Sequence, residues 1–111
     1  MKKIKAYIKA FKREEGTRAL HAIDGLSGAS FSDVLGFGRG KPASSGYVPG
    51  GNPSDYVRHV KVEVVCDDAL ADAVAYAIHR AAHTGLRGDG CIFISDVEWK
   101  VAIQETPPDG K

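Results

Sequence analysis

Two segments of the chain alternate between apolar and charged residues, and each is followed by a segment with helical periodicity. Residues 2–9 alternate isoleucine and alanine with lysine, and residues 60–65 alternate valine with lysine and glutamate. A period of two residues indicates a half-buried strand. In the segments that follow, 12–23 and 69–84, apolar residues recur three and four positions apart. This spacing predicts two helices, each with one buried face.

Two further strands complete the pattern. Residues 29–36 alternate around Phe31, and residues 91–97 are apolar on both faces, which predicts a strand that is central or covered on both sides. Residues 99–103 are interpreted as a short additional strand. The order β-α-β-loop-β-α-β predicts an α+β, ferredoxin-like βαββαβ fold with both helices on one face of the sheet. Because a single chain offers no layer for the other face, we expect an oligomer.

The segment between the second and third strands has a different composition. Residues 36–58 hold six glycines and three prolines and show neither period. A structureless segment of this length inside a compact domain is uncommon and usually functional. We therefore expect a long flexible loop over 37–58, and a flexible tail over 105–111.

Length and charge narrow the class of protein. The 111 residues suit a single domain over 1–111, and the formal net charge of +1 gives no reason to expect nucleic acid as a partner. No apolar run is long enough to cross a bilayer, and lysines interrupt the apolar residues at the start. We expect a cytoplasmic protein without direct membrane insertion.

No motif points to catalysis or to a closed metal site. The chain lacks a nucleophile elbow, a Walker A motif and a dinucleotide fingerprint, so we expect no enzyme activity. Cys66 and Cys91 lack CxxC spacing and are interpreted as reduced thiols, with a disulfide or shared metal site as the alternative. His79 and His83 are spaced i, i+4 and share a helix face. Packing or subunit contact is the favoured interpretation and a transition metal the alternative.

Several blocks, in this order and spacing, resemble the PII signal-transduction family from residue 2 to about residue 97. The blocks are 1–9, Phe11-Lys12, 36–39, 60–65, 82–85 and 88–93. The resemblance implies a trimer of ferredoxin-like subunits with nucleotide sites in the clefts between them. It also implies that the long loop of each subunit docks on a target protein.

The resemblance carries over to individual residues. It implies that the turn 85–90 wraps phosphates and that the base of the loop faces the nucleotide, with backbone N–H groups and an arginine as anion donors. The nucleotide-binding residues expected on this basis are Ser30, Gly36, Gly38, Arg39, Glu63, Val65, Thr84, Arg87, Gly88, Asp89 and Gly90. Tyr47, Asn52 and Tyr56 are expected on the partner-docking loop.

The departures from the family pattern concern charge. Cys91 stands where the family usually has a lysine after Gly-Asp-Gly, and Ala102 and Gln104 stand at two usual arginine positions. Each lost charge-assisted hydrogen bond is worth roughly 1.5–3 kcal/mol. The expected cofactor is therefore an adenine nucleotide, ADP or AMP rather than ATP.

Other departures affect the usual inputs of the family. Gly40 replaces a glutamine that helps to bind 2-oxoglutarate, and His59 replaces a lysine that pairs with its carboxylate, which argues against 2-oxoglutarate sensing. Asn52 stands at the position of the modified tyrosine, so uridylylation there is excluded.

The sequence thus predicts a homotrimeric PII-like regulator that controls a transporter or a metabolic enzyme through its loop. Three alternative hypotheses stay open. In the first, the chain is a paralogue that serves bicarbonate uptake or metal efflux with weak or no binding of ATP and 2-oxoglutarate. In the second it is a structural trimer that has lost ligand binding, and in the third it is a metal-responsive trimer that uses His79, His83 or the cysteines.

Overall fold

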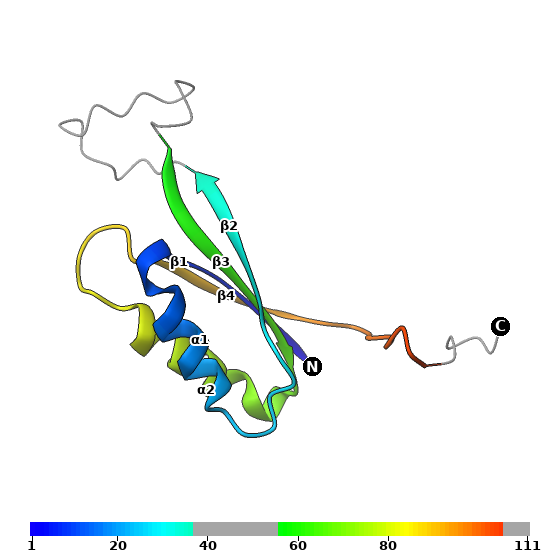
Figure 1. Ribbon diagram of the computed structural model, residues 1–111. Helices are drawn as coiled ribbons and strands as arrows, with labels where there is room; N and C mark the ends of the chain where they lie inside the picture. Colours follow the sequence, from blue (N-terminus) through cyan, green and yellow to red (C-terminus); the bar gives the residue numbers. More distant parts are fainter. Residues whose placement is uncertain (37–55, 106–111) are drawn as a thin grey trace.

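The computed structural model of the chain describes residues 1–36 and 56–105. Four strands and two α-helices follow one another in the order β-α-β-β-α-β (Figure 1). Their bounds are β1 Lys2–Lys9, α1 Arg13–His21, β2 Ser30–Gly36, β3 Val57–Cys66, α2 Asp68–Ala82 and β4 Gly90–Asp96, with a 3₁₀ turn, η1, at Ala10–Lys12. Each of the six main elements predicted from the sequence is confirmed, and most bounds shift by one to three residues.

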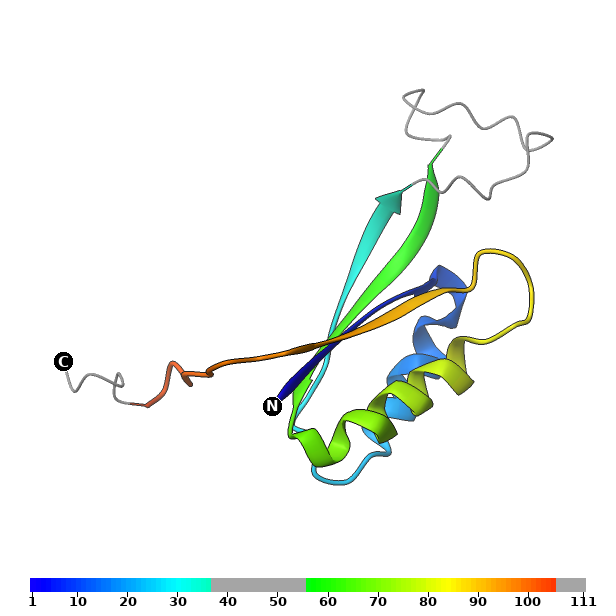
Figure 2. The same cartoon turned by 180° about the vertical axis from the view of Figure 1, so that it is seen from behind.

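The four strands form one antiparallel sheet in the order β2-β3-β1-β4. Both helices lie on the same face of this sheet, as the two opposite views show (Figures 1 and 2). This arrangement is the ferredoxin-like α+β fold predicted from the sequence. Within the described residues, no helix is long and apolar enough to span a membrane.

The period-two pattern of β1 and β3 decides which face carries the helices. Ile4, Ala6 and Ile8 on β1 are fully or almost fully buried, and so are Val74 and Ile78 on α2. The core is therefore a layer of β-branched strand residues against small and branched residues of α2. Lys3, Lys5, Lys61 and Glu63, which alternate with the buried strand residues, fall on the opposite face.

Three sequence predictions need correction. The loop predicted over 37–58 is two residues too long, because Val57 and Arg58 pair with Gly36 and Leu35 in the ladder between β3 and β2. The short strand predicted over 99–103 is absent: the chain pairs with β1 as far as Asp96 opposite Lys2, Val97 adds one hydrogen bond to the Met1 carbonyl, and residues 99–103 lie beyond the start of β1.

The last strand, expected to be central or covered on both sides, is an edge strand. Although β4 is apolar on both faces, Phe93 is 53% exposed and Ile94 is 49% exposed. Trp99, Val101 and Ile103, which follow β4, are exposed as well. Apolar residues clustered at a sheet edge and on its open face are typical of a protein–protein contact surface.

Candidate functional site

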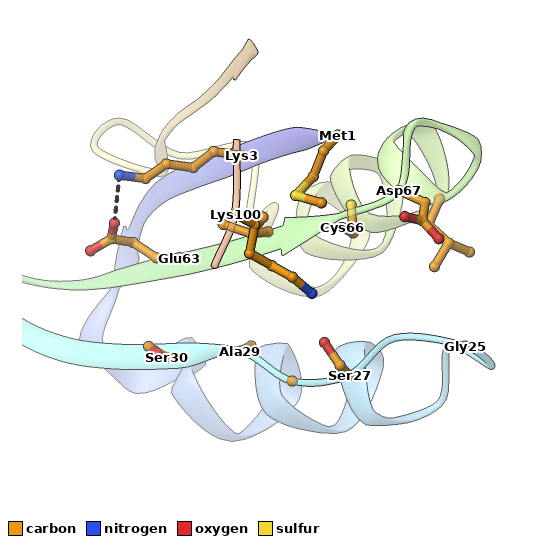
Figure 3. Close-up of a pocket in the computed structure, with 13 residues that line it drawn as sticks. Met1, Lys3, Gly25, Ser27, Ala29, Ser30, Glu63, Cys66, Asp67 and Lys100 are labelled. Carbon is orange, nitrogen blue, oxygen red and sulfur yellow. Dashed lines mark ion pairs between the residues drawn. The ribbon is translucent and has the colours of Figure 1, made fainter. Parts of the chain in front are cut away.

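A cleft of about 800 Å³ opens at the end of the sheet where β1 begins and β3 ends (Figure 3). Ser30, Glu63 and Val65, three of the residues expected to line a nucleotide, lie together in its wall. They meet because Ser30 is the register partner of Glu63 across β2 and β3, and because Val65 lies two residues further along β3. The remaining lining residues are Met1, Lys3, Gly25, Ser27, Gly28, Ala29, Cys66, Asp67, Leu70 and Lys100.

Glu63 is the charged centre of this wall. Its carboxylate pairs with Lys3 Nζ at 2.9 Å and with Lys61 Nζ at 3.2 Å. The hydrogen bond from Lys3, followed by that from Lys61, lowers the pKa of Glu63 below its ordinary value. An ionised carboxylate beside a serine hydroxyl and an apolar valine can accept hydrogen bonds from the amino group or hydroxyls of a nucleoside.

The second group of expected residues forms the turn between α2 and β4, at the opposite end of β1. The carboxylate of Asp89 accepts hydrogen bonds from the backbone N–H groups of Thr84 at 2.8 Å and Gly85 at 2.9 Å, and also from the Thr84 hydroxyl. The hydroxyl in turn accepts the N–H of Leu86 at 3.1 Å. Arg87 and Gly88 follow at the exposed tip of the turn.

Asp89 thus acts as an internal anion that shapes the turn. Hydrogen bonds from the Thr84 side chain and backbone, supplemented by those from Lys9 and Gly85, hold the pKa of its carboxyl well below the ordinary range. The N–H groups of Thr84 and Gly85 already have this carboxylate as their acceptor. A phosphate that binds the turn without displacing Asp89 must therefore use N–H groups later in the turn.

Lys9, the last residue of β1, contacts this turn and was not predicted from the sequence to do so. Its ammonium lies 3.1 Å from Asp89 Oδ1 and 3.3 Å from the Thr84 hydroxyl, and its side chain is only 19% exposed. Alternation along β1 assigned it to a solvated face. The register between Ile8 and Gly90, which brings the end of β1 beside the turn, is the signal that could have identified it.

The expected nucleotide residues are therefore divided between two places in one chain. Ser30, Glu63 and Val65 line the cleft, whereas the residues of 84–90 form the turn near the far end of β1. Gly36 ends β2 opposite Val57 and belongs to neither group. Tyr56 lies half-buried just before β3. Gly38, Arg39, Gly40, Tyr47 and Asn52 lie outside the described residues.

The alternative metal ligands are partly brought together. The rings of His79 and His83 stack with centroids 5.4 Å apart and planes inclined by 12°. Together with Cys91 they line a smaller pocket of about 410 Å³. Across residues 1–36 and 56–105, no three histidine, cysteine, aspartate or glutamate side chains are grouped to hold a metal ion. Cys66 is buried and Cys91 exposed, and both thiols are free.

Comparisons with known proteins agree with this fold. The family model described as "Nitrogen regulatory protein P-II" matches residues 1–106. Proteins named nitrogen regulatory protein P-II from Azospirillum brasilense and Rhizobium meliloti (strain 1021) are 43% and 45% identical to the chain over 104 residues. The protein of that name from Nostoc punctiforme is 41% identical over 104 residues. Each alignment covers 94% of this chain and 92% of the relative. The chain therefore belongs to the nitrogen regulatory protein P-II family, whose role is regulatory signal transduction.

Proposed function

We propose that this P-II protein is a homotrimer that senses an adenine nucleotide in the clefts between its subunits and regulates a transporter or metabolic enzyme through the segment 37–56 between β2 and β3. The proposal rests mainly on the division of the expected nucleotide residues. The cleft around Glu63 carries groups suited to a nucleoside. The turn beside Asp89 offers phosphate the backbone N–H groups that follow those already bound to the Asp89 carboxylate. A site between subunits joins the cleft of one chain to the turn of another.

The open face of the sheet supports the oligomer. Phe93 on β4 is the register partner of Lys5 and makes an edge-to-face contact with Tyr7, with ring centroids 6.5 Å apart. Both aromatic residues lie on the side of the sheet that lacks helices, and Phe93 is still 53% exposed. Burial of this aromatic pair against a second copy would remove apolar surface from water.

We expect light scattering to give three times the chain mass of 11.8 kDa. Phe93→Glu places a carboxylate in the proposed subunit contact and should shift the protein towards monomers, because an unpaired charge is costly to bury. Phe11→Glu is the matched control, since Phe11 is 69% exposed but lies in η1, outside the sheet. A monomer mass for the unchanged protein would contradict the trimer.

Nucleotide binding is tested by calorimetric titration with ATP, ADP and AMP. We expect ADP and AMP to bind, and ATP to bind no more tightly than ADP, because the uncharged Cys91, Ala102 and Gln104 leave its extra phosphate without partners. Added 2-oxoglutarate should not change these affinities.

Ser30→Ala and Ser32→Ala form a matched pair for the same titration. Ser30 lines the cleft, whereas Ser32 lies two residues along β2 and outside its wall. Loss of one hydroxyl contact should weaken ADP binding roughly threefold to tenfold in Ser30→Ala and leave it unchanged in Ser32→Ala. No heat with any of the three nucleotides would refute the proposed ligand.

The second candidate is a family member with little or no nucleotide binding. It is favoured by Cys91, which directly follows the turn and brings an uncharged thiol there. For this candidate, light scattering still gives the mass of a trimer, while titration with ATP, ADP or AMP produces no heat of binding. The two measurements together therefore distinguish it from the nucleotide sensor.

A further inference from the structure

His59, on β3, makes a contact with the turn that precedes β4. Its Nε2 atom lies 3.3 Å from the carbonyl oxygen of Gly88. His59 reaches the turn because it is the register partner of Lys9, the residue at the end of β1 that pairs with Asp89. Two neighbouring strand residues thus hold two consecutive residues of the turn, one through a backbone carbonyl and the other through a carboxylate.

The contact with the carbonyl fixes the orientation of a whole peptide group. The peptide that joins Gly88 to Asp89 is planar and trans, so its C=O and N–H bonds point in opposite directions. With the carbonyl of Gly88 directed at His59, the N–H of Asp89 is directed to the other side of the peptide. Since the N–H groups of Thr84 and Gly85 already bind the Asp89 carboxylate, this N–H belongs to the later part of the turn that a phosphate would use.

The peptide needs such a constraint because Gly88 imposes little of its own. Gly88 adopts φ +87°, and a glycine can rotate its following peptide group at small steric cost. Asp89, in contrast, is held through its side chain, which leaves the peptide before it to be oriented by other groups. The imidazole of His59, with a proton on Nε2, is the side-chain donor that contacts the Gly88 carbonyl.

We propose that His59 is a positioning residue that orients the Gly88–Asp89 peptide so that the Asp89 N–H faces a bound phosphate group. This rests on the proposed function, because it assigns a cause to the affinity of the same turn. In this role His59 need not touch the nucleotide. It acts through the orientation of the peptide. His59, which stands where the family usually has a lysine, therefore has a role other than binding a ligand carboxylate.

The experiment compares His59→Ala, His59→Gln and His21→Ala in the full-length protein. Alanine removes the donor, glutamine offers a side-chain N–H of similar reach, and His21 is an exposed histidine on α1 that serves as the matched control. The ¹³C resonance of the Gly88 carbonyl is recorded without ligand, and ADP and inorganic pyrophosphate are titrated by calorimetry.

In His59→Ala we expect the Gly88 carbonyl resonance to move upfield and the affinity for both ligands to fall roughly threefold to tenfold. His59→Gln should restore most of the shift and of the affinity, and His21→Ala should behave like the unchanged protein. If His59 served only to stabilise the fold, His59→Gln would not restore ligand affinity, and the Gly88 carbonyl shift would not change in parallel with that affinity.

Two outcomes would overturn the inference in different ways. If the unchanged protein binds ADP and His59→Ala binds it equally well, or the carbonyl resonance does not move, the inference fails and the proposed function stands. If the unchanged protein binds neither ADP nor pyrophosphate, the proposed function fails and the inference fails with it.

Discussion

Gly90→Ala should abolish stable folding of this protein. A β-carbon at position 90 would lie 1.7 Å from the carbonyl oxygen of Tyr7 and 2.8 Å from its carbonyl carbon. The Gly90 φ of +102° is itself a conformation that residues with a side chain rarely adopt. Tyr7 lies inside β1, between the pairings of Ala6 and Ile8, and cannot retreat without breaking the ladder to β4. We expect a loss of more than about 4 kcal/mol in the free energy of unfolding.

The measurement is urea denaturation followed by circular dichroism at fixed protomer concentration. Gly28→Ala is the control, because a β-carbon there meets nothing within 4 Å and Gly28 has no positive φ. This control should stay within about 0.5 kcal/mol of the unchanged protein. If Gly90→Ala unfolds at the same urea concentration as Gly28→Ala, the close approach of β4 to β1 at Tyr7 is wrong.

Asp89→Asn should release the turn while leaving the sheet in place. The amide of asparagine keeps one oxygen, but it loses the charge and cannot accept from the N–H groups of Thr84 and Gly85 and pair with Lys9 as well. Hydrogen exchange of the Thr84 and Gly85 amides should accelerate roughly tenfold or more, because bonds to a carboxylate are stronger than neutral ones. The affinity for ADP should also fall roughly tenfold or more, because the turn that is proposed to bind its phosphates is no longer held in shape.

Ser95→Ala, at an exposed position on β4, serves as the control for this exchange measurement. Core amides of β1 should exchange alike in both variants and in the unchanged protein. If the amides of Thr84 and Gly85 are equally protected in Asp89→Asn, the carboxylate does not hold the turn.

The depressed pKa of Asp89 also predicts a pH dependence. Because the folded-state pKa lies below the unfolded value of about 3.9, the carboxylate stabilises the folded turn above that value. Its contribution is lost only as the pH falls from about 4 towards the folded pKa. The carboxyl ¹³C resonance of Asp89 should thus remain that of an ionised group at about pH 3, and titrate near its ordinary value in urea. If Asp89 titrates near its ordinary pKa in the folded protein as well, its hydrogen bonds with Thr84 are contradicted.

The fold could be predicted from local patterns because those patterns are strong. The alternation in 2–9 and 60–65 is the same alternation that buries Ile4, Ala6 and Ile8 beside Val60 and Val62. The ends of the strands were harder to predict, since a strand continues as far as the neighbouring strand offers backbone groups for hydrogen bonds. Val57 and Arg58 extend β3 because β2 lies beside them, and residues 99–103 form no strand because they lie beyond the start of β1.

The candidate site was only partly accessible from the sequence. The turn 85–90 was identified by its glycines and its resemblance to the family, and Ser30, Glu63 and Val65 do share one cleft wall. Lys9 was missed because a lysine at the end of an alternating strand looks solvated until the antiparallel register places Gly90 beside Ile8. His59 was noted only as the residue that stands at a usual lysine position of the family. Its contact with Gly88 arises because His59 pairs with Lys9 at the end of the sheet beside the turn.

The sequence by itself determined the order of elements, the buried face of the sheet and the family, because periodicity and motif spacing are properties of neighbouring residues in the chain. Only the tertiary structure decided that β4 is an edge strand with exposed Phe93, and that the expected nucleotide residues fall into two separate groups. Those facts depend on strand order and register. These are set by packing between segments as far apart in the chain as Lys2 and Asp96, 94 residues, and leave no local signal in the sequence.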